Sequence, residues 1–121
     1  MDEGPLIGIV GPCSAGKSEL ARRLRGAGWR VKEIRQEHSG VPTMWQRITH
    51  PDFLIYLDVS VEAAMAREHL SKPPAWWAEE REVRLRHARE HADLYLDTSA
   101  MTPEAVFRAV IAALKEAFPD G

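Results

Sequence analysis

The sequence predicts an α/β fold, a three-layer domain in which helices cover both faces of a small parallel sheet of about four strands. Three observations lead to this fold class. A glycine-rich turn, Gly11–Ser18, joins an apolar run to a helical pattern. A second apolar run, Phe53–Val59, is nearly uninterrupted, which is typical of a central strand covered on both faces. Strand and helix patterns alternate along the rest of the chain, which favours one parallel sheet.

The first half of the chain supplies two strands, a helix and a long loop. Leu6–Val10 is a short apolar strand, and the helix after the turn is expected from about Gly16 to Arg25, where a Gly-Ala-Gly sequence ends it. Trp29–Ile34 alternates apolar and charged residues, which favours a strand at a sheet edge. Glycine, prolines and polar residues predict a loop from Arg35 to Pro51, with one helical turn over Met44–Arg47.

The second half supplies three helices and two strands, the first strand being the buried run already described. Ser60 is a good cap for the helix that follows this strand, and Thr102 followed by proline is a good start for the last helix. The remaining expected elements are a helix over Val61–His69, a helix over Ala78–His91, a strand over Asp93–Asp97 and a helix from Pro103 to about Phe118. Right-handed crossovers would place a ligand at the carboxyl ends of the strands, beside the glycine-rich turn.

The glycine-rich turn carries the most specific signal in the chain. It reads Gly-x-x-x-x-Gly-Lys-Ser, the phosphate-binding loop (P-loop), and it has the required strand before it and helix after it. Backbone N–H groups of such a loop surround an anion, and the helix dipole favours negative charge at the same place. Lys17 is expected to contact the β- and γ-phosphates, and the Ser18 hydroxyl to bind Mg²⁺. The sequence therefore predicts a P-loop NTPase fold that binds a nucleoside triphosphate through Gly11, Ser14, Ala15, Gly16, Lys17, Ser18 and Glu19.

Length and composition narrow the remaining classes. With 121 residues we expect a single minimal domain over residues 1–121. A net charge of −2 gives no support for a nucleic-acid or membrane partner attracted by overall charge. Cys13 is the only cysteine, so no intramolecular disulfide can form. A cytoplasmic protein is expected, because we see no signal peptide and no apolar run near the ~20 residues of a membrane span.

Two nucleotide-binding classes fit poorly. The chain contains no asparagine, so it lacks the Asn-Lys-x-Asp motif with which guanine-specific GTPases read their base. Motor and AAA-type ATPases need more chain than 121 residues. Small P-loop kinases remain.

Two segments outside the loop carry a resemblance to such kinases. They are Pro51–Glu62 followed by Arg67, and Ala92–Ser99 followed by Thr102–Glu104. The first resembles the late strand-and-helix segment, and the second the last strand and final helix, of the nucleoside and nucleotide kinases, thymidylate kinase among them. With the phosphate loop, the resemblance covers the first quarter of the chain and most of its second half.

The resemblance implies ATP as the donor, with GTP not excluded, Mg²⁺ as the cofactor, and transfer of the γ-phosphoryl group to a small acceptor such as a nucleoside or nucleotide. It also implies that the arginine-rich helix before the last strand is a lid whose guanidinium groups stabilise the transferring group. Arg81 and Arg84, which would share one helix face, are the catalytic candidates. Thr98 would lie near the base.

The chain also departs from that group of kinases. It contains no Asp-Arg or Asp-x-Arg pair, and the span Gly26–Asp52 is too short for an acceptor-binding flap between two strands. The acceptor region therefore looks trimmed to a loop. In this loop His38 and Ser39 are candidates to hold an acceptor or a water. Trp45 and Arg47 are candidates to line an acceptor pocket, with Trp45 equally expected as an apolar plug.

Two acidic residues compete for the metal, together with Ser18. Asp58 closes an apolar run, as the acid of a Walker B motif does. In the kinases that the chain resembles, however, this strand does not carry the metal-binding acid. Glu37 follows the strand predicted at Trp29–Ile34, which could lie beside the phosphate loop, so its carboxylate would face Mg²⁺ directly or through water. Glu37 is the favoured candidate, as a catalytic residue and a metal ligand.

Three functions follow as hypotheses. The first is an ATP-dependent phosphotransferase. The second is a nucleotide-binding regulatory module without transfer activity, and the third is a slow NTPase completed by a second subunit. A homo-oligomer stays open, and Trp76 with Trp77, expected to be exposed, is the candidate interface or lid hinge.

Overall fold

A computed structural model describes residues 4–119 and contains one parallel four-stranded sheet. The strands lie in the order β2-β1-β3-β4, and every neighbouring pair is parallel. Their bounds are Leu6–Val10 for β1, Arg30–Glu33 for β2, Phe53–Asp58 for β3 and Leu94–Asp97 for β4. The predicted α/β class with a small parallel sheet is confirmed.

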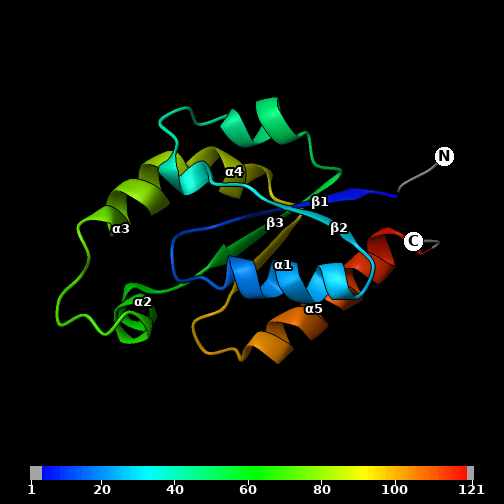
Figure 1. Cartoon of the computed structure of the whole chain (residues 1–121). Coiled ribbons are helices and arrows are strands. Elements are labelled where there is room, and N and C mark those ends of the chain that lie inside the picture. Colours follow the sequence, from blue (N-terminus) through cyan, green and yellow to red (C-terminus); the bar gives the residue numbers. More distant parts are fainter. Residues whose placement is uncertain (1–3, 120–121) are drawn as a thin grey trace.

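Helices lie on both sides of this sheet (Figure 1). Helices α1 (Lys17–Gly26) and α5 (Pro103–Ala117) cover one face, where they pack on each other. Helix α4 (Arg86–His91) packs on β3 from the other face, and α2 (Val61–Arg67) follows the carboxyl end of β3. The glycine-rich loop connects β1 to α1 at that same end of the sheet.

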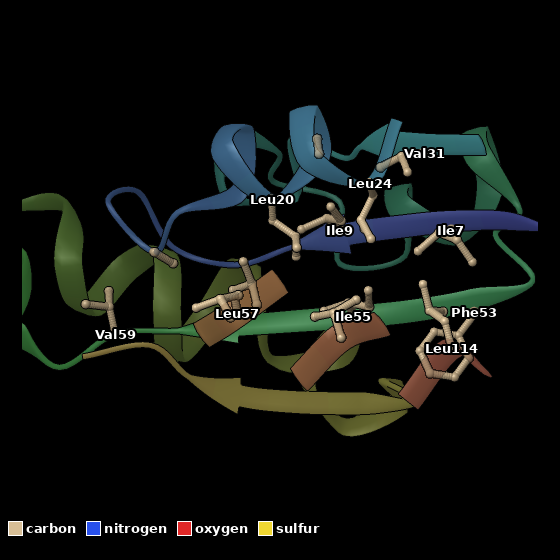
Figure 2. Close-up of a cluster of buried hydrophobic side chains, with 14 of the residues drawn as sticks. Ile7, Ile9, Leu20, Leu24, Val31, Phe53, Ile55, Leu57, Val59 and Leu114 are labelled. Carbon is tan, nitrogen blue, oxygen red and sulfur yellow. The ribbon is translucent and has the colours of Figure 1, made fainter. Parts of the chain in front are cut away.

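The period of two along each strand divides the apolar residues between the two faces. Ile7 and Ile9 of β1 lie with alternate residues of β3 in the larger cluster, which α1 and α5 cover (Figure 2). The intervening residues of β3 face the other way and pack against Trp45 and Leu85. A strand buried on both faces reads as an unbroken apolar run, which is why β3 was the clearest element in the sequence.

The predicted helix Ala78–His91 ends at His91 as expected, but its start and its winding are wrong. The helical segment begins earlier, with α3 (Trp76–Ala78), and continues as a π-helical stretch η3 (Glu79–Arg84) before α4. The N–H of Leu85 donates to the carbonyl of Glu80, five residues back, at 2.9 Å. The wider turn brings Glu80 and Leu85 toward one side, and both are buried. Arg81 and Arg84 were expected to share one face of a regular α-helix. This prediction is wrong, because the π-helical winding changes which residues lie on one face.

The predicted loop Arg35–Pro51 contains two ordered turns. A 3₁₀-helix, η1 (Gln36–His38), and a π-helical turn, η2 (Trp45–Thr49), are joined by the side chain of Gln36, which is completely buried. Its amide nitrogen donates to the carbonyl of Val41 at 2.8 Å and its amide oxygen accepts the N–H of Trp45 at 2.8 Å. The helical turn predicted over Met44–Arg47 is present as η2, one to two residues further along. The rest of the span gave no helix or strand pattern because its order comes from one buried amide.

Replacing Gly8 tests how closely the two ends of the span between β2 and β3, Ile34 and Pro51, pack on β1. A Cβ there would lie 2.8 Å from Ile34 Cδ1 and 2.9 Å from Pro51 Cβ. Gly8→Ala should therefore lower the free energy of unfolding by about 1–3 kcal/mol, as overpacking does. Gly26→Ala is the matched control, because no atom lies within 4 Å of that Cβ position. It should raise the stability by ~0.4–1 kcal/mol. Urea unfolding measures both changes, and a gain in stability for Gly8→Ala would contradict the close packing.

Candidate functional site

The loop Gly11–Ser18 has a backbone that only this kind of sequence adopts easily. A Cβ on Gly11 would lie 2.1 Å from the carbonyl oxygen of Leu57, so the loop can cross β3 here only as glycine. Ser14 and Gly16 have positive φ angles of 72° and 98°. Alternation of left-handed and ordinary residues turns successive N–H groups toward one side, the arrangement of an anion-binding nest. Helix α1 begins at the end of the loop, and no side chain caps its first N–H groups.

Lys17 lies folded over this loop. Its ammonium donates to the carbonyls of Gly11 at 2.8 Å and Pro12 at 2.9 Å, and Nζ lies 3.1 Å from Glu37 Oε2. The three donors of the ammonium thus have three acceptors. Lys17 is held at the mouth of the loop, between the loop and η1.

Glu37 is positioned by η1 and is almost completely buried, with 5% of its side chain exposed. One carboxylate oxygen pairs with Lys17, while the other, Oε1, is buried and has no hydrogen-bond partner among the described residues. The backbone carbonyl of Glu37 accepts a hydrogen bond from Arg84 at 3.2 Å, which ties η1 to the helical segment 76–91. We call this segment, which the sequence predicted as a lid, the lid segment. A buried carboxylate oxygen without a donor is costly, and a cation would satisfy it.

A cavity of about 370 Å³ opens beside Lys17. Two of the side chains that line it carry oxygen atoms able to bind a metal: the hydroxyl of Ser18 and the carboxylate of Glu37. The Ser18 hydroxyl donates a hydrogen bond to Glu33 Oε1 at 2.8 Å. Hydroxyl and carboxylate oxygens are the ligands that Mg²⁺ takes in proteins, so this donor set fits Mg²⁺. The full lining is Cys13, Ser14, Gly16, Lys17, Ser18, Glu19, Glu33, Ile34, Arg35, Glu37 and His38.

A second cavity, of about 260 Å³, lies on the other side of the loop and shares Ser14, Gly16 and Glu19 with the first. Its wall is mostly apolar, formed by Ala15, Leu20, Met101, Pro103 and Val106. Arg67 and Thr98 complete it. Arg67 donates to the carbonyl of Ser14 at 2.6 Å and to the hydroxyl of Thr98 at 3.2 Å, so this wall is tied to the loop.

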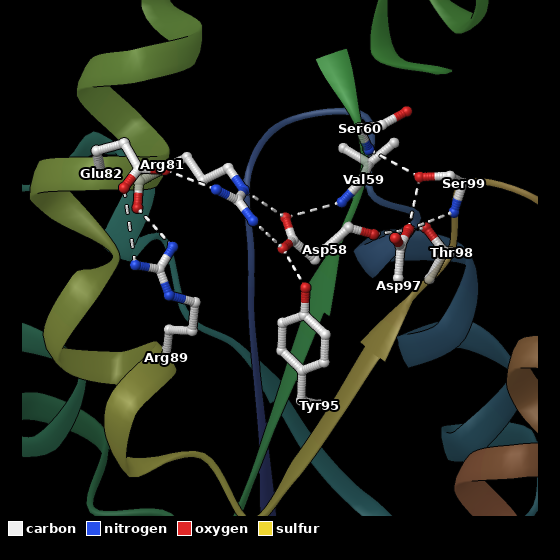
Figure 3. A network of polar contacts seen from close by, with 10 residues as sticks. All are labelled: Asp58, Val59, Ser60, Arg81, Glu82, Arg89, Tyr95, Asp97, Thr98 and Ser99. Carbon is white, nitrogen blue, oxygen red and sulfur yellow. Dashed lines mark hydrogen bonds and ion pairs between the residues drawn. The ribbon is translucent and has the colours of Figure 1, made fainter. Parts of the chain in front are cut away.

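Asp58 lines neither cavity; its carboxylate belongs to the polar network of Figure 3, and its backbone carbonyl accepts the Thr98 hydroxyl at 3.0 Å. Arg81 donates to its two oxygens at 3.0 and 2.8 Å, and the hydroxyl of Tyr95 donates to Oδ2. Burial acts to raise the pKa of Asp58, but these hydrogen bonds outweigh it and hold the pKa below its ordinary value. Both oxygens are therefore committed to linking the lid segment with the sheet.

The lid segment places a carboxylate, rather than an arginine, against the loop. Buried Glu80 accepts the backbone N–H of Cys13 at 3.1 Å and the thiol of Cys13 at 3.4 Å. Burial and the neighbouring Glu80 raise the pKa of Cys13 to about 11. Besides its bond to the Glu37 carbonyl, Arg84 has Nε 3.4 Å from Glu79 Oε1. Neither Arg81 nor Arg84 lines either cavity.

The structure brings together most, but not all, of the residues predicted from the sequence. The phosphate loop, Lys17, Ser18 and Glu37 meet at one cavity, and Thr98 lines the other. Trp45 is the apolar plug: it is 6% exposed, and its indole N–H donates to His87 Nδ1 at 3.1 Å. Arg47 is exposed. The tryptophans at 76 and 77 are half-buried against the core, which corrects the expectation that they are exposed.

Three charged residues at the site were missed by the sequence reasoning. Glu33 ends β2, and β2 pairs with β1, so a parallel-sheet argument could have placed it beside the loop. Arg35 follows it in the same cavity lining. Glu80 had no sequence signal, because it belongs to a run of glutamates and arginines that reads as a solvated helix.

The comparisons with known proteins give no family assignment: no protein-family model matches the chain, and no curated protein matches it. Within residues 4–119 no helix is long and apolar enough to cross a membrane.

Asp58→Asn tests the link between lid and sheet. A carboxyl whose folded pKa is lowered contributes stability above its unfolded pKa, and this stability is lost as the pH falls through the folded value. The substitution should lower the free energy of unfolding at neutral pH by about 2–4 kcal/mol, because Arg81 loses its buried acceptor. It should also flatten the loss of stability below about pH 4. Denaturant titrations at several pH values measure both effects.

Glu82→Gln is the control for that experiment. Glu82 is the other carboxylate partner of Arg81, at 2.6 Å, but its side chain is 56% exposed. An exposed pair contributes less than ~1 kcal/mol, so this variant should remain close to the wild type. Equal effects of the two substitutions would show that the buried network is not the stabilising feature.

Proposed function

We propose that the chain is a P-loop protein that binds Mg-ATP and transfers its γ-phosphoryl group to a small acceptor. One observation carries the proposal: the Gly11–Ser18 loop leaves a central parallel strand, turns into a helix N-terminus, and holds Lys17 against a buried Glu37. The sequence motif alone would support less. Here the loop conformation, the lysine and a buried acid meet at one place.

The two cavities support a nucleotide whose nucleoside lies in one cavity and whose phosphates lie toward the other. A nucleoside fits the apolar cavity, where Arg67 and Thr98 form the polar edge. The phosphates would then follow the loop amides and the start of α1 toward Lys17. The resemblance to nucleoside and nucleotide kinases favours ATP over GTP.

Ser18, Glu33 and Glu37 are the residues that would hold Mg²⁺. When bound, Mg²⁺ neutralises and orients the phosphate oxygens. Glu37 is a better candidate than Asp58, because its Oε1 has no partner among the described residues while Asp58 accepts from Arg81 and Tyr95. Lys17 would exchange a loop carbonyl for a phosphate oxygen, keeping Glu37 as its counter-ion.

A specific observation favours the second candidate, a nucleotide-binding module without transfer activity. Arg81 is held by Asp58 and Arg84 by the carbonyl of Glu37, so the predicted lid arginines point away from the cavity beside Lys17. Transfer would require the lid to release at least one of them, or Arg35 to act in their place. The two candidates therefore differ in whether the lid opens.

Lys17→Met tests nucleotide binding. Loss of the ammonium should weaken the binding of Mg-ATP by at least ~100-fold, about 2.7 kcal/mol, as expected for a charge-assisted phosphate contact. Titration with a fluorescent ATP analogue measures the affinity, and Lys72→Met, at an exposed loop lysine, should leave it unchanged. Ser18→Ala keeps the Lys17–Glu37 pair and should remove only the Mg²⁺-dependent part of the affinity. Unaltered binding by Lys17→Met would overturn the proposal.

Turnover decides between the two candidates. A coupled ADP-release assay over nucleosides, nucleotides and small alcohols should find an acceptor that raises turnover above hydrolysis. Glu37→Gln should then reduce turnover by ~10–100-fold, the range seen when an ion's coordination is disturbed. Glu33→Asp is the matched conservative change at the neighbouring carboxylate, and it should reduce turnover less than Glu37→Gln does. Binding without acceptor-dependent turnover would identify the module, and specific activity that rises with protein concentration would identify an NTPase completed by a second subunit.

A further inference from the structure

Three side chains with different metal-binding atoms converge at the mouth of the loop. Cys13, Glu37 and His38 each offer one ligand atom, and these atoms all lie within 4.8 Å of one another. Cys13 Sγ lies 4.0 Å from His38 Nε2, which lies 3.8 Å from Glu37 Oε2. The cysteine comes from the phosphate loop and the other two residues from η1, so the fold, and not one local motif, brings them together.

The donor set is sulfur, imidazole nitrogen and carboxylate oxygen. A tetrahedral zinc ion with bonds of ~2.0–2.3 Å holds its ligand atoms ~3.3–3.8 Å apart. The two separations that involve His38, 4.0 and 3.8 Å, already lie close to this spacing. The separation between Cys13 Sγ and the Glu37 carboxylate is at most 4.8 Å, which exceeds it by no more than about 1–1.5 Å. The exposed side chain of His38 (53%) can rotate toward an ion held between the other two ligands. Hard cations such as Mg²⁺ avoid thiolates, so these three donors select a softer ion.

A second observation concerns the same carboxylate, which has one oxygen free to bind a cation. Glu37 is 4% exposed, and its Oε1 is buried without a hydrogen-bond partner among the described residues. Its Oε2 already serves Lys17. Glu80, also buried, lies against the Cys13 thiol. Two buried carboxylates thus surround the sulfur, with the Lys17 ammonium as the cation that contacts one of them.

We propose that Cys13, Glu37 and His38 bind a thiophilic divalent cation, with Zn²⁺ the best match. The ion takes the place of the thiol proton, which is released to solvent, and the sulfur becomes a thiolate ligand. Three protein ligands leave a fourth position open to water. None of its ligands needs a phosphate to be in place. Because Glu37 is also a ligand in the proposed Mg²⁺ site, the two ions are alternatives at this carboxylate, and the site is tested without nucleotide.

Cobalt(II) titration of the full reduced chain, without nucleotide, tests the site. Cys13 is the only cysteine, so a sulfur-to-cobalt charge-transfer band can come from this residue alone. We expect the band to saturate at one ion per chain, to disappear on addition of Zn²⁺ and to persist in excess Mg²⁺. Absence of the band, or its loss in Mg²⁺, would overturn the proposal.

Variants distinguish a site made by all three residues from binding by the Cys13 thiolate alone. Cys13→Ser should abolish the band, and His38→Asn should weaken cobalt affinity by at least ~10-fold. His50→Asn is the matched control, because His50 is exposed outside the cluster and asparagine tolerates its φ of 51°. Equal affinities of His38→Asn and the wild type would show that only the thiolate binds. Far-UV circular dichroism checks that each variant is folded, and no readout involves ATP, so failure here leaves the nucleotide proposal standing.

Discussion

The buried ion pair between Lys17 and Glu37 is the interaction on which the candidate site depends. It joins the phosphate loop to η1 across a 3.1 Å contact in which both side chains are mostly buried. The attraction within a buried ion pair is largely offset by the cost of removing both charges from water, so the pair contributes little net stability. Removing one partner, however, leaves an uncompensated buried charge. The pair therefore makes the position of each residue depend on the other, which is what a site needs if the lysine is to meet an anion and the carboxylate a cation.

The surroundings of the pair come from segments far apart in the chain. Gln36 fixes η1 by satisfying backbone groups of the loop that follows it, and Arg84 of the lid segment holds the carbonyl of Glu37. The lid segment in turn is fastened to β3 by Arg81 and Asp58. Any movement of the lid must therefore disturb both Asp58 and η1. On the proposed function, this coupling would let a movement of the lid segment reach Glu37 through its contacts with the protein alone.

The sequence predicted the sheet and the place of the glycine-rich loop between a strand and a helix because each has a local pattern. The apolar run of β3 follows from burial on both faces, and the loop follows from fixed residue types between a strand and a helix. Glu37 could be proposed because it follows a strand that pairs with β1. The π-helical η3 could not be predicted, since its winding is selected by the burial of Glu80 and Leu85 on the same side. The roles of Arg81 and Asp58 depend on that winding, and a regular helix led to a different expectation.

The charge of the cavity beside Lys17 constrains what can enter it. Its lining contains the carboxylates of Glu19, Glu33 and Glu37, against the positive charges of Lys17 and Arg35. One further carboxylate, that of Glu80, is bound to the amide of Cys13 at the loop. A polyphosphate brings several more negative charges into this volume, where charges are poorly screened. On the proposed function it can therefore enter only together with a cation, so the metal is part of the ligand rather than an addition to it. Glu19 pairs with Arg22 and Arg23, and Glu33 with Arg25 and the Ser18 hydroxyl. Glu37 pairs with Lys17 through Oε2, so its buried Oε1, which has no hydrogen-bond partner among the described residues, is the oxygen left for that cation.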